Sequence, residues 1–218
     1  MRTLVLATRN RHKVGEIQAV LGPAFEYLTL ADLPAAPEVE EDAGTFAGNA
    51  RKKAETLAGW LAANGSALAG REIWVLADDS GLEVDALDGA PGVHSARFAA
   101  FDTGRPGNST DAENNQKLLR RLDGVPASDR TARFRCVMAL TPVPAAGAAP
   151  SVTQLFTGVC EGSVLDQPRG TGGFGYDPLF LPQGFELSFA ELGEEAKNRI
   201  SHRARALAGL HDWLAAHP

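Results

Sequence analysis

The sequence predicts an α/β fold, because strand-like and helix-like patterns alternate along it. Near the start, an apolar run over residues 3–8 gives way to helical spacing of apolar residues over 14–21, and a second strand-like run covers 25–30. Later, residues 131–140 alternate between apolar and polar side chains, and a strand pattern resumes over 152–164. The last two runs predict a long hairpin. Thr110 with Glu113, and Ser188 with Glu191, match capping boxes that predict the starts of two further helices.

The length and composition of the chain fit one large domain or two closely joined lobes. The chain has 218 residues, 44% of them hydrophobic and 22% charged, which is ordinary for a globular protein. Its formal net charge is −6, which argues against general nucleic-acid binding because that needs basic surfaces. An anionic substrate would therefore need local basic groups or a metal ion.

Neither a membrane segment nor a metal-binding cysteine pattern is evident. No signal-like apolar run follows Met1, so we expect no membrane association. Cys136 and Cys160 both fall in strand-like segments, and two cysteines do not make a disulfide framework in a chain of this length. We therefore expect reduced thiols in the protein core and a cytoplasmic protein.

The segment 75–84 is the clearest candidate for a site. An apolar run ends in Asp78 and Asp79, and the chain becomes apolar again after Ser80 and Gly81. We expect a buried strand whose end presents the two carboxylates at a cleft, the usual place for ligands in open α/β sheets. Adjacent carboxylates repel, so a hard cation such as Mg²⁺ would suit them. The alternative is an ordinary acidic turn.

A basic segment follows the first strand and precedes the first helix. A helix N-terminus offers free N–H groups and the positive end of the helix dipole, which suit phosphate. The alternative is a solvated basic turn, and the glycines of a P-loop are missing. The residues of this segment are Thr8, Arg9, Asn10, Arg11, His12 and Lys13.

An acidic run precedes a helix that is predicted to begin near Thr45. Asp42 or Thr45 could cap that helix, and acidic side chains suit its N-terminal dipole. One interpretation is that Glu40 or Glu41 completes a metal site with Asp79. The alternative is a solvated acidic surface.

Two segments in the last third of the chain could bind a ligand. The first could bind a base, and the second a phosphate or a base, unless the second is only a surface helix start with exposed charges. Residues 170–175 formally match G-x-G-x-x-G, but neither a strand before them nor a helix after them supports a dinucleotide fingerprint. We expect a loop that places Phe174, Tyr176 and Asp177 around a ligand, or packs its aromatic rings on the core. Residues 197–203 gather Lys197, His202 and Arg203 around the start of the last helix, which Ser201 could cap.

Taken together, these motifs resemble the inosine/xanthosine triphosphate pyrophosphatases, and the resemblance covers nearly the whole chain. It depends on several specific motifs in the same order. They are Thr8–Lys13, Gly44–Ala54, Ala77–Leu82, Gly89–Gly92 with Ser95–Arg97, Gly172–Pro178 and Ile200–Arg203.

The resemblance implies a mixed central sheet with flanking helices, in a single domain of residues 1–218 whose two lobes surround a substrate cleft. It implies Mg²⁺-dependent cleavage of ITP, dITP or XTP to the monophosphate and pyrophosphate by a homodimer that binds neither nucleic acid nor membrane. Asp79 would be the general base or a metal-linked acid, with Glu40 or Glu41 as further metal ligand. Residues Thr8 to Lys13 would bind the triphosphate, and Ser80, Phe174, Gly175, Tyr176, Asp177, Lys197, His202 and Arg203 the rest of the nucleotide.

One departure from the family pattern is Gly48, where the family usually carries Glu; its loss would weaken a capping box and could alter a polar contact near the metal. Two other functions fit the same motifs. One is a pyrophosphatase for modified pyrimidine triphosphates, and the other is a nucleotide sensor that has lost catalysis.

Overall fold

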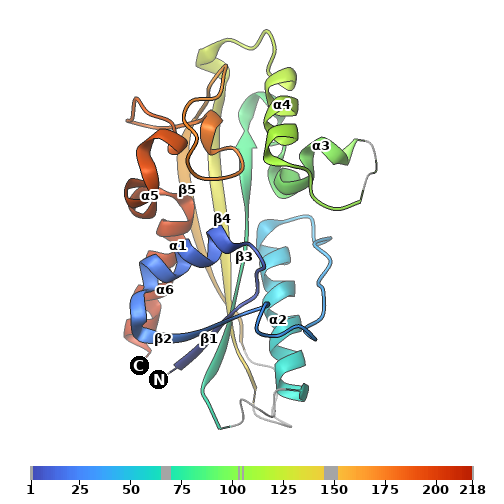
Figure 1. Ribbon diagram of the computed structural model, residues 1–218, viewed down its shortest axis with the longest axis vertical. Coiled ribbons are helices and arrows are strands. Elements are labelled where there is room, and N and C mark those ends of the chain that lie inside the picture. The colour runs from blue at the N-terminus through green and yellow to red at the C-terminus, as the bar shows by residue number, and fades with distance from the viewer. Residues whose placement is uncertain (1, 65–69, 103, 105, 145–151, 218) are drawn as a thin grey trace. The chain divides into compact units, whose positions relative to one another are not determined.

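The computed structural model describes residues 2–64, 70–102, 104, 106–144 and 152–217, and it confirms the α/β fold. Its strands form a mixed six-stranded sheet in the order β2-β1-β3-β4-β5-β6, with helices flanking the sheet (Figure 1). The strands are β1 (Arg2–Leu6), β2 (Phe25–Thr29), β3 (Ile73–Val84), β4 (Thr131–Pro142), β5 (Gln154–Val164) and β6 (Phe180–Pro182). The helices are α1 (Arg11–Leu21), α2 (Phe46–Asn64), α3 (Phe98–Phe101), α4 (Asp111–Arg121), α5 (Phe189–Ile200) and α6 (His202–Ala216).

The chain divides into two compact units. Unit 1 comprises Met1–Asp79, Val137–Thr157 and Ala206–Pro218, and unit 2 comprises Ser80–Cys136 and Gly158–Arg205. The boundary falls within strands β3, β4 and β5, so each of these long strands contributes to both units.

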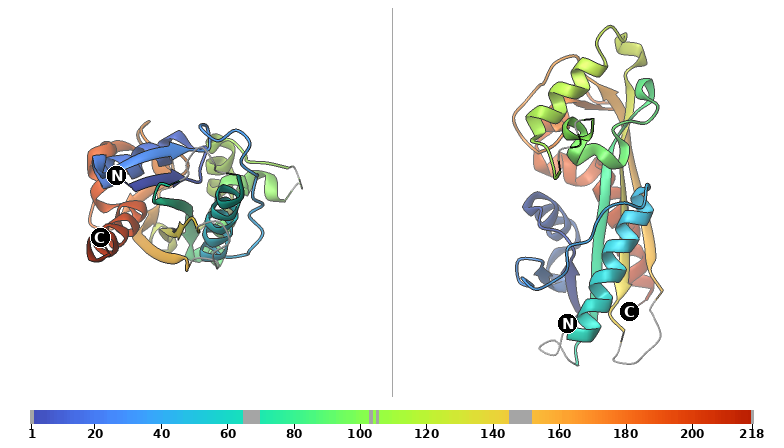
Figure 2. Two further views of the ribbon diagram at one scale, coloured as in Figure 1. Left: turned by 90° about the horizontal axis from the view of Figure 1, so that it is seen from below. Right: turned by 90° about the vertical axis from the view of Figure 1, so that its right-hand side faces the viewer.

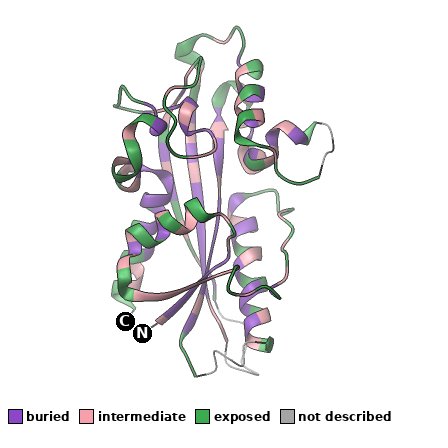
Figure 3. Cartoon of the chain, viewed as in Figure 1, coloured by how far each residue is buried: buried purple, intermediate pink, exposed green. Residues whose placement is uncertain are grey.

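In unit 1, parallel pairing brings the end of β1 beside β3. Leu6 is the register partner of Leu76, and the Ala7 N–H donates to the Leu76 carbonyl at 2.8 Å. Both strands are almost entirely buried here (Figure 3), which explains their continuous apolar sequences. Strand β1 therefore ends two residues before the level of Asp78. Helix α2 runs along the same stretch of β3 (Figure 2).

The structure corrects the predicted end of the central strand. Asp78 and Asp79 do not end β3 but lie in its middle, and the strand continues to Val84. The physical reason is that Leu82 and Val84 are fully buried, so the apolar pattern that continues after the acidic pair belongs to the same strand. The carboxylates are buried within a strand instead of projecting from a loop.

In unit 2, a core of aliphatic and aromatic side chains from β3, β4, β5 and helices α4 and α5 supports the loops. The two predicted capping boxes are confirmed, with Thr110 paired to Glu113 at α4 and Ser188 paired to Glu191 at α5. Helix α5 is interrupted at Gly193, whose φ of 78° lies outside the helical region.

The cysteine prediction is also confirmed, since Cys136 and Cys160 are free and buried. In the part of the chain that the structure describes, every helix is too short or too polar to cross a membrane.

Candidate active site

The predicted basic segment joins β1 to α1 in unit 1, and Asn10 caps the helix. The Asn10 Oδ1 atom accepts the backbone N–H groups of His12 and Lys13 at 2.9 and 3.3 Å, while its own N–H donates to Thr8 Oγ1. The side chains of this segment then separate. Lys13 turns toward β3, whereas Arg9 forms an exposed ion pair with Glu38. The side chains of Arg11 and His12 lie at the surface.

Unit 1 holds a cluster of opposite charges around the acidic pair, which we call the carboxylate–lysine cluster: Lys13, Glu41, Asn49, Lys53, Asp78 and Asp79. Lys13 Nζ lies 3.0 Å from Asp78 Oδ2, a carboxylate that is only 1% exposed. Lys53 Nζ lies 2.9 Å from Glu41 Oε1 and 3.9 Å from Asp79 Oδ1, and it donates to the Asp78 carbonyl at 2.6 Å. The two lysines thus compensate the two buried carboxylates of β3.

Two members of this cluster, Asn49 and Lys53, were not among the predicted site residues. Asn49 is 1% exposed, and its Nδ2 atom donates to Asp79 Oδ2 at 2.9 Å. Its Oδ1 atom accepts the Ala43 N–H at 3.0 Å, which fixes the orientation of the amide. The signal in the sequence was their spacing, because residues four apart share a helix face and Asn49 lies within an otherwise apolar stripe.

Burial and neighbouring charges shift the ionisation of this cluster. Burial raises the pKa of Asp79, and the Lys53 ammonium and the Asn49 hydrogen bond only partly oppose this shift. Burial would lower the pKa of Lys53, but the carboxylates of Asp79, Asp78 and Glu41 outweigh it and the net pKa is raised. Lys53 therefore stays cationic at neutral pH, and Asp79 is a better proton acceptor than an ordinary aspartate.

The acidic run supplies one carboxylate to this cluster. Glu41 is half-buried against Lys53, while Glu40 is exposed. Among the described residues, no three acidic, histidine or cysteine side chains gather as a metal cage. Glu41 and Asp79, which both approach Lys53, are an oxygen-donor pair of the kind that holds Mg²⁺ together with substrate phosphates.

The departure at Gly48 changes the cap of α2. Thr45, not Asp42, is the cap, because its Oγ1 atom accepts the Gly48 N–H at 3.0 Å. Gly48 cannot supply the carboxylate of a full capping box. A Cβ atom on Gly48 would lie 2.7 Å from the Ala43 Cβ atom, so the chain before the helix packs directly against this glycine. Ala43 is the residue whose N–H is held by Asn49.

Unit 2 holds the other predicted residues in a second group, which we call the aromatic–cation cluster: Ser80, Phe174, Asp177, Lys197, His202 and Arg203. Lys197 Nζ donates to Asp177 Oδ2 at 2.6 Å and lies 4.4 Å from the centre of the Phe174 ring. Arg203 is 1% exposed, donates to Ser80 Oγ at 2.9 Å and has its guanidinium carbon 5.9 Å from the same ring. Two cations thus approach one aromatic ring.

The glycine-rich segment is a loop, as predicted, and Asp177 closes it. Asp177 Oδ2 accepts the Phe174 N–H at 2.9 Å. Gly173 has a φ of 72°, and a Cβ atom there would collide with the Asp177 carboxylate, so this position requires glycine.

Two predicted residues use their side chains within the protein. The Tyr176 hydroxyl donates to the Ser95 carbonyl at 2.9 Å, and burial raises the pKa of this tyrosine. The His202 ring stacks on Phe134, with ring centres 4.7 Å apart. Both side chains are about 4% exposed, so they support the loop and the start of α6 from the core side.

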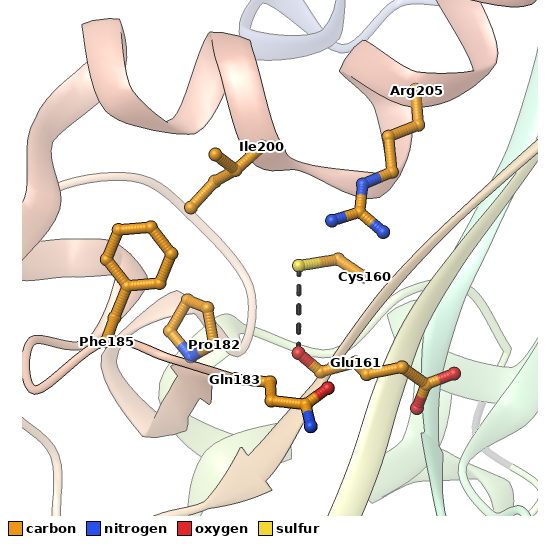
Figure 4. A pocket seen from close by; sticks show the side chains of 7 residues that line it. All are labelled: Cys160, Glu161, Pro182, Gln183, Phe185, Ile200 and Arg205. Carbon is orange, nitrogen blue, oxygen red and sulfur yellow. Dashed lines mark hydrogen bonds between the residues drawn. The ribbon is translucent and has the colours of Figure 1, made fainter.

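A separate pocket of unit 2 contains none of the predicted residues (Figure 4). It is lined by Cys160, Glu161, Pro182, Gln183, Phe185, Ile200 and Arg205. Burial raises the pKa of the Cys160 thiol to about 11, so the sulfur is protonated and unreactive at neutral pH.

Comparisons with known proteins agree over nearly the full chain. The model of the Ham1 family matches residues 4–213. A dITP/XTP pyrophosphatase from Geobacter sulfurreducens is 50% identical over 98% of this chain and 97% of its own length, and one from Shouchella clausii is 45% identical over the same shares. A HAM1 protein from Coxiella burnetii has a TM-score of 0.79 and 38% identity over 99% of this chain and all of that chain. The Staphylococcus aureus Ham1 protein has a TM-score of 0.78 and 34% identity over the whole of both chains.

Proposed function

The chain belongs to the Ham1 family, and on this premise we propose that it hydrolyses the nonstandard purine nucleoside triphosphates ITP, dITP and XTP to the monophosphate and pyrophosphate. Relatives that carry the name dITP/XTP pyrophosphatase support this proposal. The observation that carries it is the convergence of Lys53 and Asn49 on Asp79, a buried carboxylate with a raised pKa. Such a group is suited to taking a proton from water.

In this proposal, Asp79 is the general base. A water oxygen forms a new bond to the α-phosphorus, and one water proton passes to an Asp79 oxygen. The α–β phosphoanhydride bond breaks, and pyrophosphate leaves with the bonding electron pair. Asn49 keeps Asp79 Oδ2 in place through its amide donor, and in this proposal Oδ1 takes the proton.

The lysines of the carboxylate–lysine cluster and the basic segment would compensate the negative charge of the phosphates. Lys13 and Lys53 are ammonium groups held by carboxylates, and the segment from Thr8 to Lys13 adds donors at the start of α1. Glu41 and Asp79 would hold Mg²⁺, which neutralises phosphate charge when bound. We assign Glu41, and not Glu40, because Glu41 shares the Lys53 ammonium with Asp79.

The aromatic–cation cluster would bind the base. The Phe174 ring offers a stacking surface, with Gly175 and the backbone of Tyr176 beside it. Hypoxanthine and xanthine carry a 6-oxo acceptor where adenine carries an amino donor, and the guanidinium of Arg203 and ammonium of Lys197 are donors only. A site built on such hydrogen bonds can reject a mismatched base by roughly 10⁴–10⁵-fold.

Three broader proposals accompany this function. Residues 1–218 act as one catalytic domain. The protein works in the cytoplasm as a homodimer, without nucleic-acid or membrane partners. Light scattering coupled to size exclusion tests the dimer, because a single protomer has a mass of 23.0 kDa.

The decisive experiment measures pyrophosphate release from ITP, dITP, XTP, GTP and ATP, once with Mg²⁺ and once with EDTA. We expect rapid Mg²⁺-dependent cleavage of the first three and little cleavage of GTP or ATP. Cleavage of modified pyrimidine triphosphates without ITP cleavage would show that the substrates are pyrimidine and not purine nucleotides. Tight ITP binding without turnover in Mg²⁺ would show that the protein is a nucleotide sensor and not an enzyme.

A further inference from the structure

Helix α4 holds both polar backbone groups of Gly175, the residue directly after Phe174. The Gly175 N–H donates to Asp111 Oδ2 at 2.7 Å, and Asn115 Nδ2 donates to the Gly175 carbonyl at 3.0 Å. Asp111 and Asn115 are four residues apart, so they lie on one face of the helix. One helix face therefore fixes the peptide groups on both sides of Gly175.

These contacts matter because the loop is flexible by composition at this point. Phe174 lies between Gly173 and Gly175, which have φ values of 72° and 63°. Glycine has the largest backbone freedom to lose on ordering, so a phenylalanine between two glycines is poorly placed by its local sequence. Asp177 holds the Phe174 N–H from one side, and α4 supplies the contacts on the other.

Helix α4 is itself firmly attached to unit 2 by neighbouring side chains. The Asn114 side chain accepts the Ala99 N–H at 2.8 Å and donates to the Ala96 carbonyl at 3.3 Å. The Lys117 ammonium donates to the Phe98 carbonyl at 2.6 Å, and Leu118 is fully buried in the core. The helix can therefore transmit a fixed position to the loop.

The asparagine at 115 is not explained by stability alone. Within the described residues, its Oδ1 atom is buried and has no hydrogen-bond partner. An unpaired buried acceptor lowers stability, so a leucine of similar shape would avoid this cost. What leucine lacks is the amide donor to Gly175.

We propose that Asn115 and Asp111 are positioning residues that hold Phe174 in place for stacking on the substrate base, and so set base affinity. This inference rests on the proposed function, because it assigns the base to Phe174. It places the effect in the KM for the nucleotide, and leaves the phosphate contacts of unit 1 unchanged.

The main test compares Asn115→Leu with wild type and with Gln116→Ala, an exposed neighbour on α4 as matched control. For Asn115→Leu we expect the KM for ITP to rise about tenfold, as for one lost hydrogen bond. We expect kcat, inhibition by inorganic pyrophosphate and the melting temperature to stay close to wild type, since removal of the unpaired Asn115 Oδ1 atom offsets the loss of the donor to the half-buried Gly175 carbonyl. Asn115→Asp, which faces the Gly175 carbonyl with an acceptor, should raise KM more.

A KM for Asn115→Leu within twofold of wild type would overturn the proposal. A parallel change of pyrophosphate inhibition and melting temperature would also overturn it, because a merely structural role predicts that pattern. If Asn115→Leu does not fold, Asp111→Ala at an exposed position replaces it, and Asp111→Asn should restore KM because it keeps an acceptor for the Gly175 N–H.

Failure of the positioning role can be distinguished from failure of the proposed hydrolysis. Titration calorimetry of ITP in EDTA measures affinity without turnover. If wild type binds but does not cleave ITP, catalysis fails while a tenfold weaker affinity of Asn115→Leu still supports the positioning role. If wild type cleaves ITP and the variant binds it equally well, the positioning role alone is overturned.

Discussion

The carboxylate–lysine cluster of unit 1 and the aromatic–cation cluster of unit 2 are held together by different kinds of interaction. In unit 1, side chains from α1, α2 and β3 meet each other as opposite charges with little water access. In unit 2, hydrogen bonds to the loop backbone hold Phe174, while the Asp177 carboxylate and the Ser80 hydroxyl hold the two cations beside its ring. A change of charge in unit 1 should therefore reach the chemistry, whereas a change in unit 2 should reach affinity and selection.

The largest expected effect in this comparison is that of Asp79→Asn. We expect kcat for ITP to fall about 10³-fold or more, because the variant loses the proposed base and one proposed metal ligand together. Pyrophosphate release under saturating ITP measures it. Asp42→Asn is the control, because it only breaks an exposed ion pair with Lys52. A kcat for Asp79→Asn within tenfold of wild type would remove this residue from the chemistry.

The next effect separates the two candidate metal ligands. Glu41→Gln should lower kcat about 10²-fold and raise the Mg²⁺ concentration needed for half-maximal rate, because one carboxylate of the pair is lost. Glu40→Gln, one residue away and exposed, should stay within twofold of wild type. A titration of initial rate against Mg²⁺ checks both. The reverse order of effects would assign the ligand to Glu40.

In unit 2, Phe174→Ala should have a smaller effect on a different quantity. We expect KM for ITP to rise about tenfold, within the roughly 1–3 kcal/mol that stacking of a base on an aromatic ring contributes. We expect kcat to change less than threefold. Phe101→Ala is the control, an exposed phenylalanine of the same unit. If kcat fell and KM stayed constant, the difference between the two clusters would disappear.

The smallest effect concerns stability and pH. Because burial raises the pKa of Asp79 in the folded state, protonation of Asp79 stabilises the fold below its ordinary pKa. This stabilisation is lost as pH rises through the raised pKa, so the ionised group lowers stability at pH 7. Asp79→Asn should then melt about 2–4 °C higher than wild type at pH 7 in EDTA, with a difference that shrinks toward pH 4. A lower melting temperature at pH 7 would mean that attraction to Lys53 outweighs burial.

Much of the fold followed from local pattern. The capping boxes at Thr110 and Ser188 were predicted correctly, because a cap depends on side chains three residues apart. The loop at 170–175 was distinguished from a dinucleotide fingerprint by the segments around it. The end of β3 was predicted wrongly, because two adjacent carboxylates are unfavourable in a strand unless distant lysines compensate them.

The sequence by itself determined the α/β alternation, the helix caps, the buried thiols and the set of chemical groups available for a nucleotide. Tertiary structure decided which of these groups meet. It brought Lys13 to Asp78 through parallel pairing of β1 and β3, joined Asn49 and Lys53 to Asp79, and placed Asp111 and Asn115 against Gly175. The reason is physical: periodicity and capping act over a few residues, whereas pairing of buried charges and of loop backbone depends on elements that are distant in the chain.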